Sequence, residues 1–557
     1  MKHDRPKIPD VRSTARTFDI NLKFGGGVLA LFVGLELLSW HGYGWQVLGG
    51  FLVFSSVILA GEALKLWRQE RSKQREIKKF FESIEVGARW LTLNDLKRAG
   101  MLEGQKVLGA LDGHLIYEPP QASHSIVVSA NGGGKSTCMA LPTIMSIAHQ
   151  ISRGAQMGCV VVDGKDGELA HQAAPMLDEL GIDYAILDDQ DQFPDHPRVV
   201  AMNPLGGLAH AHRADPRSFG DVLDRVANTL CPSVKGDGRN EYFYRSPRER
   251  LTIPLRFFLQ ERRQVYPGLV WAAMSNPDDW VKLLELSVTS NDAALRAEAS
   301  KVLEYMAKKQ EHEPSHVGAA LAALSPFAAG RWLHDVGSGR EGKPLLEHHE
   351  VMRRPLIVFI TGRYESVQSS ANYFGLHVQA MLQAQMREPA WIVHYIAEEA
   401  ANVPLREIAE KMQVLRGKGA RIHIITQSRA ALESAYGERE TRQIFNEAVI
   451  KQYLMLTDAE EAEKLSRAIG DQVIIRQNKS LNDDNLATQS GFAITRERLI
   501  TPEALLSMPR SDQIINIGGL GWLKCQKVHC SELGPYRLGR NPVENKEAVV
   551  NHKYFLK

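Results

Sequence analysis

The sequence predicts an α/β protein with a mostly parallel sheet, an inserted all-helical domain and an N-terminal hairpin of two transmembrane helices. Short, almost continuously apolar segments alternate with helix-length segments, a pattern typical of a parallel sheet covered on both faces. Between Asn203 and Pro355 the strand-like segments disappear and helical patterns replace them. Two long apolar stretches lie near the N-terminus and are flanked by basic residues.

The N-terminal apolar stretches, residues 24–40 and 45–66, have the length that crossing a bilayer requires, about 17–25 residues. Trp40, Tyr43 and Trp45 bracket the turn between them, where an aromatic belt would contact the membrane interface. Basic residues lie on both flanks, which places both flanks in the cytoplasm by the positive-inside rule: Lys2, Arg5, Lys7, Arg12, Arg16 and Lys23 before the hairpin, and Lys65, Arg68, Arg71, Lys73, Arg75, Lys78 and Lys79 after it.

Two other interpretations of this hairpin are a cleaved signal peptide and a buried core hairpin. The signal peptide is disfavoured because the leader is long and no small-residue cleavage site precedes a soluble start. We therefore expect a multi-pass membrane protein that contacts lipid and carries most of its chain in the cytoplasm.

Composition is that of an ordinary globular protein with two to four domains: 557 residues, of which 24% are charged. The formal net charge of +2 gives no indication of a uniformly basic surface for nucleic acid, although a local basic channel would not show in the total. The five cysteines form no CxxC pair. Cys525 and Cys530 could be half of a metal site, but no matching pair lies nearby, so we expect reduced thiols.

The pattern divides the chain into an N-terminal tail, hairpin and basic linker (1–80), a first part of the α/β domain (81–206), an all-helical insertion (207–350) and a second part of the α/β domain (351–557). The loop described next makes this α/β domain the expected nucleotide-binding domain. We expect strands at residues 125–129, 159–163, 184–187, 356–360, 392–396, 421–426 and 450–456. Within the insertion we expect helices at 219–230, 247–261 and 292–309.

A glycine-rich turn between the strand at 125–129 and a helix predicts a phosphate-binding loop. It reads Asn131-Gly132-Gly133-Gly134-Lys135-Ser136-Thr137. In this arrangement backbone N–H groups and the helix N-terminus bind phosphate, the lysine reaches the outer phosphates and the serine hydroxyl ligates Mg²⁺. The expected nucleotide-binding residues are Ser129, which occupies the position where the usual motif begins with glycine, Ala130, Asn131, Gly132, Gly133, Gly134, Lys135, Ser136 and Thr137.

An ATPase of this class also needs an acidic residue at a strand end for Mg²⁺ and a carboxylate that activates water. Two predicted strands end in acid: one at Asp163 and one at Glu398-Glu399. Local pattern alone does not decide between them, although an adjacent acid pair favours a cation site because like charges repel without one. A further strand ends at Gln427, which could sense the terminal phosphate or cap a helix.

The order of these motifs resembles the type IV secretion coupling ATPases of the TraD/TraG-like group, within the FtsK/HerA motor class. The resemblance spans about residues 105–530. It rests on these stretches: Gly134-Lys135-Ser136 followed by Leu141-Pro142, Asp163-Gly164-Lys165-Asp166-Gly167-Glu168, Leu187-Asp188, Met202-Asn203-Pro204-Leu205, Glu398-Glu399-Ala400-Ala401-Asn402, Leu415-Arg416-Gly417-Lys418-Gly419, Gln427-Ser428 and Ala435-Tyr436-Gly437.

The resemblance implies a RecA-like P-loop ATPase that uses ATP and Mg²⁺, forms a hexameric ring and lies on the bacterial inner membrane. It implies that Lys135 and Ser136 bind phosphate and Mg²⁺, that Glu399 polarises the attacking water and that Gln427 senses the γ-phosphate. Glu398 takes the place of the metal-side acid. Asp163 and Lys165 are expected to support the site. Arg416 or Arg421 could act on a neighbouring subunit's nucleotide or be structural.

The implied partners are the secretion channel components and a relaxase–DNA complex or effector proteins. In the family the helical insertion is associated with substrate recognition. Residues 235–250 interleave arginines with Tyr242, Phe243 and Tyr244, a composition that suits single-stranded DNA, but a buried aromatic helix face is the favoured interpretation.

Three functions are compatible with the motifs. The first is an ATP-driven motor that moves conjugative DNA or protein into a secretion channel. The second is a membrane docking platform that recruits effector proteins without moving DNA. The third, a chromosome-segregation pump, is disfavoured because no winged-helix module follows the ATPase.

Overall fold

The computed structural model describes residues 14–40, 42–83, 87–120, 124–232, 241–387, 391–403, 408–481 and 488–556. The chain divides into two compact units. The first comprises residues 1–88 and 470–499, and the second comprises residues 89–469 and 500–557.

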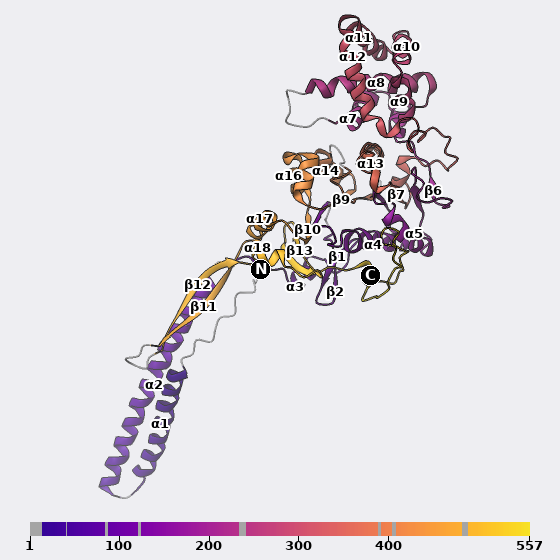
Figure 1. The fold of residues 1–557 in the computed structure, drawn as a ribbon. Coiled ribbons are helices and arrows are strands. Elements are labelled where there is room, and N and C mark those ends of the chain that lie inside the picture. The colour runs from indigo at the N-terminus through magenta and orange to yellow at the C-terminus, as the bar shows by residue number, and fades with distance from the viewer. Residues whose placement is uncertain are drawn as a thin grey trace. The chain divides into compact units, whose positions relative to one another are not determined.

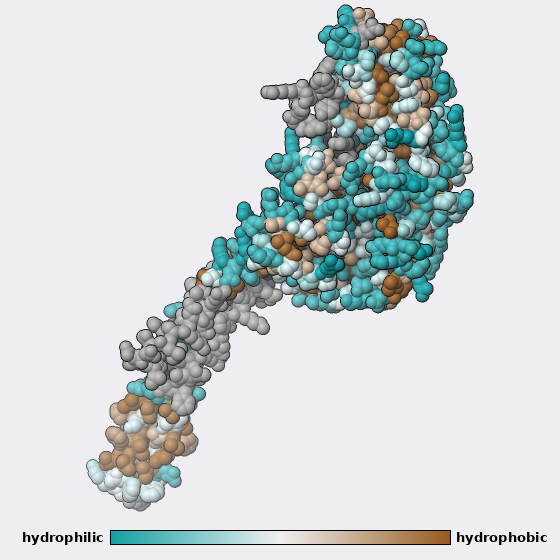
Figure 2. Space-filling model, in the orientation of Figure 1, coloured by the Kyte–Doolittle hydropathy of each residue, from teal (hydrophilic) through white to brown (hydrophobic). Residues whose placement is uncertain are grey.

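The first unit contains a hairpin of two long helices, α1 (Thr14–Leu38) and α2 (Tyr43–Ser83). Gly34 and Gly49 lie where the helices are closest, since a Cβ on Gly49 would be 2.8 Å from the Gly34 carbonyl oxygen. By length and composition both helices could cross a membrane, over Ile20–Leu38 and Tyr43–Glu76. Their outward surface is strongly apolar (Figure 2). The expected helix pair is therefore confirmed, and its insertion in a membrane stays a prediction.

A long antiparallel ribbon, β11 (Asp471–Leu481) and β12 (Thr488–Arg498), completes the first unit. The backbone N–H of Ala88 donates to the carbonyl of Asp471, so the ribbon joins the chain that follows α2. The sequence pattern places these residues in the nucleotide-binding domain and gives no sign of a ribbon.

The second unit is built on a twelve-stranded sheet with the order β2-β1-β14-β13-β10-β3-β9-β8-β4-β7-β5-β6. From β10 to β6 all neighbours are parallel, and the strands expected from the sequence are all present. The expected strands are β3 (Ser125–Ser129), β4 (Met157–Asp163), β5 (Tyr184–Leu187), β7 (Ile357–Thr361), β8 (Ile392–Ala397), β9 (Ala420–Thr426) and β10 (Ile450–Met455). The short strand β6 (Val199–Val200), next to β5, was not expected.

Four antiparallel strands extend the sheet on the other side of β10. They are β1 (Val107–Leu111), β2 (His114–Tyr117), β13 (Asp512–Ile517) and β14 (Gly521–Gln526). Two short strands, β15 (Leu533–Gly534) and β16 (Tyr554–Phe555), pair separately. The antiparallel strands were not predicted, because β1 and β14 are interrupted by glycine and polar residues and lack a continuous apolar run. A mostly parallel sheet is confirmed.

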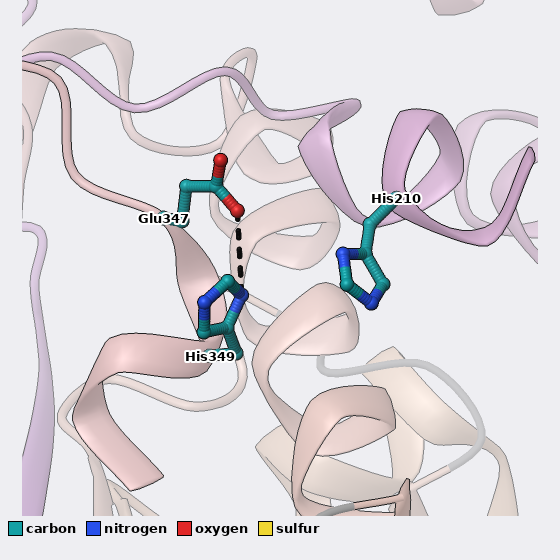
Figure 3. A group of neighbouring side chains, drawn as sticks. All are labelled: His210, Glu347 and His349. Carbon is teal, nitrogen blue, oxygen red and sulfur yellow. Dashed lines mark ion pairs between the residues drawn. The ribbon is translucent and has the colours of Figure 1, made fainter. Parts of the chain in front are cut away.

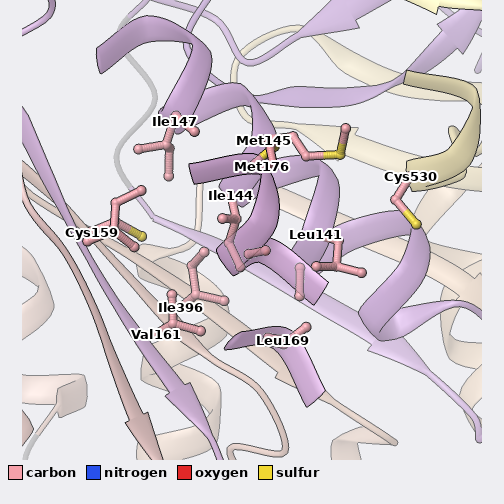
Figure 4. Close-up of a cluster of buried hydrophobic side chains, with 14 of the residues drawn as sticks. Leu141, Ile144, Met145, Ile147, Cys159, Val161, Leu169, Met176, Ile396 and Cys530 are labelled. Carbon is pink, nitrogen blue, oxygen red and sulfur yellow. The ribbon is translucent and has the colours of Figure 1, made fainter. Parts of the chain in front are cut away.

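Helices cover both faces of the parallel strands (Figure 1). α4 (Leu141–Ser152) and α5 (Glu168–Glu179) pack on one face, where Leu141, Ile144 and Val161 lie in an extended apolar cluster (Figure 4). α13 (Ala371–Arg387) and α14 (Ile408–Gly417) cover the other face. The remaining helices of this part are α3 (Leu93–Arg98), α15 (Arg429–Tyr436), α16 (Glu438–Glu447), α17 (Ala459–Ile469) and α18 (Pro502–Leu506).

Between β6 and β7 the chain is helical, as expected. The helices are α6 (Gly206–Ala214), α7 (Phe219–Leu230), α8 (Glu241–Arg262), α9 (Pro267–Ser275), α10 (Pro277–Val288), α11 (Ala293–Lys309) and α12 (Glu313–Ala323). Helices α8 to α12 gather beyond one face of the sheet (Figure 1).

The candidate DNA-contacting segment lies partly outside the described residues, which omit 233–240 and the side chains of Tyr242, Phe243 and Tyr244. Of its arginines, Arg250 is buried and its Nη2 lies 2.7 Å from the Glu313 carboxylate. Arg250 therefore belongs to the packing of α8 against α12 and does not face a nucleic acid.

Candidate active site

The glycine-rich loop follows β3, which lies in the middle of the sheet between β10 and β9. Gly134 has φ of +94° where the helix begins, a conformation that side chains rarely adopt. A Cβ on Gly133 would lie 2.0 Å from the Ser129 hydroxyl oxygen. Ser129 therefore fits the position usually taken by glycine because Gly133 leaves room for its hydroxyl.

The helix after the loop starts with an unexpected π-helical turn, Lys135–Ala140, and continues as α4. This turn buries the side chains of Lys135 and Ser136. Lys135 Nζ donates to the Ser129 carbonyl at 3.3 Å and to Asn131 Oδ1 at 3.1 Å, so the lysine bends back over the loop. Burial lowers the pKa of Lys135, while Glu399 opposes that shift.

The acid pair after β8 lies directly beside these residues. The Ser136 hydroxyl donates to Glu398 Oε1, and Lys135 Nζ lies 3.5 Å from Glu399 Oε1. Glu399 has φ of +54°, a left-handed conformation that costs a non-glycine residue about 1–2 kcal/mol. Hydrogen bonds of the surrounding turn stabilise this conformation: Ala400 N donates to the Ile425 carbonyl, and Asn402 N donates to the Glu399 carbonyl.

Lys165 connects the two glutamates. Its Nζ lies 2.9 Å from Glu399 Oε1 and 3.4 Å from Glu398 Oε1. Burial favours a higher pKa for Glu399, but the charges of Lys165 and Lys135 outweigh it and hold the pKa of Glu399 below its ordinary value. Glu399 is therefore ionised at neutral pH and can accept a proton.

Asp163, the other candidate acid, has a different role. Its Oδ2 accepts from the backbone N–H groups of Leu169 and Ala170 at 2.8 and 3.0 Å, so it caps the start of α5. Burial raises the pKa of Asp163 well above its ordinary value. In the structure the acid pair after β8 contacts the loop, whereas the Asp163 carboxylate caps α5.

Gln427 follows β9 and donates through Nε2 to Glu399 Oε2 at 3.2 Å. The helix-cap alternative applies to the next residue, Ser428, whose hydroxyl accepts from Ala431 N at 3.1 Å. Thr137 follows Ser136 in the π-helical turn and is half-buried. Arg421 lies at the opposite end of β9 from Gln427 and thus away from this site.

Lys527, which the sequence did not suggest, also contacts the loop. Its Nζ donates to the Gly133 carbonyl at 2.9 Å, although the two residues are 394 positions apart. It follows β14, one of the unforeseen antiparallel strands. No motif marks this lysine, and only the position of β14 in the sheet would have indicated it.

The residues fit a Mg²⁺–nucleotide complex. Glu398 Oε2 is buried and has no hydrogen-bond partner among the described residues, and the same side chain binds the Ser136 hydroxyl. A carboxylate oxygen and a serine hydroxyl are hard oxygen ligands of the kind that Mg²⁺ prefers. The helix N-terminus beyond Gly134 favours negative phosphate groups.

Residues 392–510 match a family model described as the TraM recognition site of TraD and TraG. The structure is similar to the bacterial conjugative coupling protein TrwBdeltaN70 in its unbound monoclinic form, with a TM-score of 0.59 and 18% identity over 83% of this chain and 96% of that chain. The chain therefore has a fold similar to that of the coupling protein TrwB. It also matches TrwB in complex with the ATP analogue ADPNP, with a TM-score of 0.57 and 16% identity over 85% and 98% of the two chains.

A third match is TrwB in complex with ADP and Mg²⁺, with a TM-score of 0.56 and 18% identity over 83% and 97% of the two chains. No curated protein matches the chain. The coupling-protein fold confirms the RecA-like architecture that the motif order implied. The segment matched by the family model includes β8 and β9, which carry Glu398, Glu399 and Gln427 at their ends.

Proposed function

We propose that this protein is an ATP-driven coupling motor that delivers DNA, alone or with an attached protein, to a type IV secretion channel. The observation that carries the proposal is the contact of the acid pair with the phosphate-binding loop: Glu398 with Ser136, and Glu399 with Lys135. The coupling-protein fold and the TraD/TraG family match support the choice of this motor class over other P-loop proteins. The TrwB complexes with ADPNP and with ADP and Mg²⁺ support ATP and Mg²⁺ as ligands.

Each site residue then has a role. The loop from Ser129 to Thr137 binds the phosphates, Lys135 neutralises their charge, and Ser136 with Glu398 holds Mg²⁺, which stabilises the charge that develops on the phosphate oxygens. Glu399 accepts the proton of the attacking water, as its ionised state allows. Gln427, which is hydrogen-bonded to Glu399, reports the presence of the γ-phosphate.

The protein acts at the bacterial inner membrane as a hexameric ring. The apolar hairpin of α1 and α2 anchors it in lipid, and the basic flanks keep the body in the cytoplasm. Its partners are further copies of itself, channel components, and a relaxase–DNA complex or effector proteins. Arg416 and Arg421 are the candidates for a contact with a neighbouring subunit's nucleotide.

The experiment is ATP turnover by the purified full-length protein with and without single-stranded or duplex DNA. We expect DNA to stimulate turnover several-fold, and Lys135→Ala to abolish it. Glu399→Gln should lower the rate by about 10²–10⁴-fold while ATP binding persists, because the amide keeps the size of the side chain but cannot accept a proton. Lys524→Ala, on the antiparallel strand β14 and away from the site, is the matched control and should match the wild type.

Two results would count against the proposal in different ways. Turnover that is indifferent to DNA would favour the docking platform, which recruits effector proteins without moving DNA. Normal hydrolysis by the Glu399→Gln variant would mean that another group accepts the proton.

A further inference from the structure

A cavity of about 370 Å³ lies where the helical insertion joins the sheet. It is lined by residues of the chain that leaves the sheet and of the chain that returns to it. These two segments are bonded to each other, since Ala201 N donates to the Pro344 carbonyl and Leu346 N to the Ala201 carbonyl. The cavity therefore lies at the two connections between the sheet and the insertion, distant in sequence from the phosphate-binding loop.

Three metal-binding side chains meet at this cavity: His210 from α6, and Glu347 and His349 at the start of the 3₁₀-helical segment His348–Met352 (Figure 3). One possible ligand atom from each lies within 4.8 Å of the other two. His349 Nδ1 is 3.3 Å from Glu347 Oε2. Ligands about 2.0–2.2 Å from a tetrahedral zinc ion are separated by about 3.3–3.5 Å, so this pair already has the spacing of two zinc ligands.

The scaffold holds these side chains in place. α6 packs closely on α13, since a Cβ on Gly207 would lie 2.9 Å from the Ala380 Cβ. The neighbouring His348 points into the core, where it is buried and bonded to His377 at 3.1 Å. Because successive residues of a 3₁₀ helix point about 120° apart, this anchor directs His349 away from the core and toward the cavity.

The charges are compatible with a cation. Two arginines, Arg213 and Arg387, line the same cavity. Arg387, one of those arginines, is itself compensated, because its Nη2 lies 3.8 Å from Asp215. Glu347 supplies the negative charge at the site.

We propose that His210, Glu347 and His349 bind a divalent transition metal of the zinc class, with the fourth position open to the cavity. Two imidazoles and one carboxylate are a recurrent ligand set for zinc, whereas Mg²⁺ prefers oxygen ligands alone. The metal links α6 to the returning chain and so ties the two connections of the helical insertion together. This site is separate from the nucleotide site.

The test is a titration of the full-length protein with Zn²⁺ against a chromophoric chelator, with excess Mg²⁺ present to occupy oxygen-rich sites. We expect one tight equivalent in the wild type, and an affinity at least about tenfold weaker in His210→Ala and His349→Ala. His212→Ala is the matched control: it lies on the same helix, but its ring contacts Phe219 with centroids 5.0 Å apart. It should bind as the wild type does.

Two further measurements make the result decisive. Co²⁺ bound in place of Zn²⁺ should give the intense visible absorption of a tetrahedral site, and His210→Ala should lose it. Glu347→Gln keeps the size of the side chain and removes its charge, so it tests the site even where an alanine variant folds poorly. Equal Zn²⁺ affinity in the wild type, His210→Ala and Glu347→Gln would overturn the proposal.

Discussion

Lys165 offers a sharp test of the proposal that Glu399 is the catalytic base. Its Nζ lies 2.9 Å from Glu399 Oε1, and both side chains are largely buried. Lys165→Met removes the charge and keeps the length of the side chain. At this distance a unit charge pair is worth about 1.4 kcal/mol in the dielectric of water and about 6 kcal/mol at an effective value of 20. The lower figure alone corresponds to about one pKa unit.

The direction of the expected pH shift follows from the proposed role of Glu399. The carboxylate must be ionised to accept a proton, so activity is lost as pH falls through its pKa. Lys165 holds that pKa below its ordinary value. Without Lys165 the pKa rises, and the acid limb of kcat/KM against pH should move at least about one unit toward higher pH.

The assay is steady-state ATPase activity across the acid and neutral range, with kcat/KM as the readout because it reports the free enzyme. Lys527→Met is the control, since Lys527 also contacts the loop, through the Gly133 carbonyl, but pairs with neither glutamate. Ionisation of the ATP phosphates affects both variants equally. If the acid limb of Lys165→Met coincides with that of Lys527→Met, the electrostatic reasoning is refuted.

Two further predictions concern buried titratable groups. Asp163→Asn should keep most of the ATPase rate, because its side-chain oxygen can still accept from both backbone N–H groups. Asp163→Ala loses this cap and should lower the free energy of unfolding by about 1 kcal/mol. Loss of turnover in the Asn variant with normal thermal stability would restore Asp163 as a catalytic candidate. Burial lowers the pKa of His394 to about 3, so the unfolded chain takes up a proton first as pH falls below about 6.5 and the folded state loses about 1 kcal/mol between pH 6.5 and 5.5. Thermal unfolding of His394→Gln should show a correspondingly weaker loss of stability over that range, and an unchanged pH dependence would contradict this.

The parallel half of the sheet was largely predictable because most of its strands are short, mainly apolar runs that are buried on both faces. The antiparallel half was not, because its apolar runs are short or interrupted, by Gly109 in β1 and Lys524 in β14, and because part of its pairing joins segments far apart in the chain, as β1 does with β14. Because β14 was not predicted, the contact of Lys527 with the loop was not predicted either, since only the position of β14 in the sheet brings that lysine to the loop. The ribbon of β11 and β12 was missed because each of its strands mixes polar and charged residues with apolar ones.

At the site, local motifs identified the loop and the acid pair but not the contacts between them. The choice between Asp163 and the acid pair depends on the turn at the end of each strand. After β4 the chain turns into α5, whose first backbone N–H groups donate hydrogen bonds to the Asp163 carboxylate. After β8 a strained turn at Glu399 directs two carboxylates toward Ser136 and Lys135. Neither turn has a pattern that single-sequence reasoning recognises.

The charges of the site explain why the strained turn is tolerated. Lys135 and Lys165 lie among Glu398 and Glu399, so two cations and two anions compensate one another within a buried space. Removing one partner would leave an uncompensated buried charge, which costs several kcal/mol and exceeds the strain at Glu399. In the proposed mechanism Lys135 turns to the phosphates when the nucleotide binds, and we expect this to weaken its contact with Glu399. Arrival of the nucleotide would then release the carboxylate that we propose as the proton acceptor.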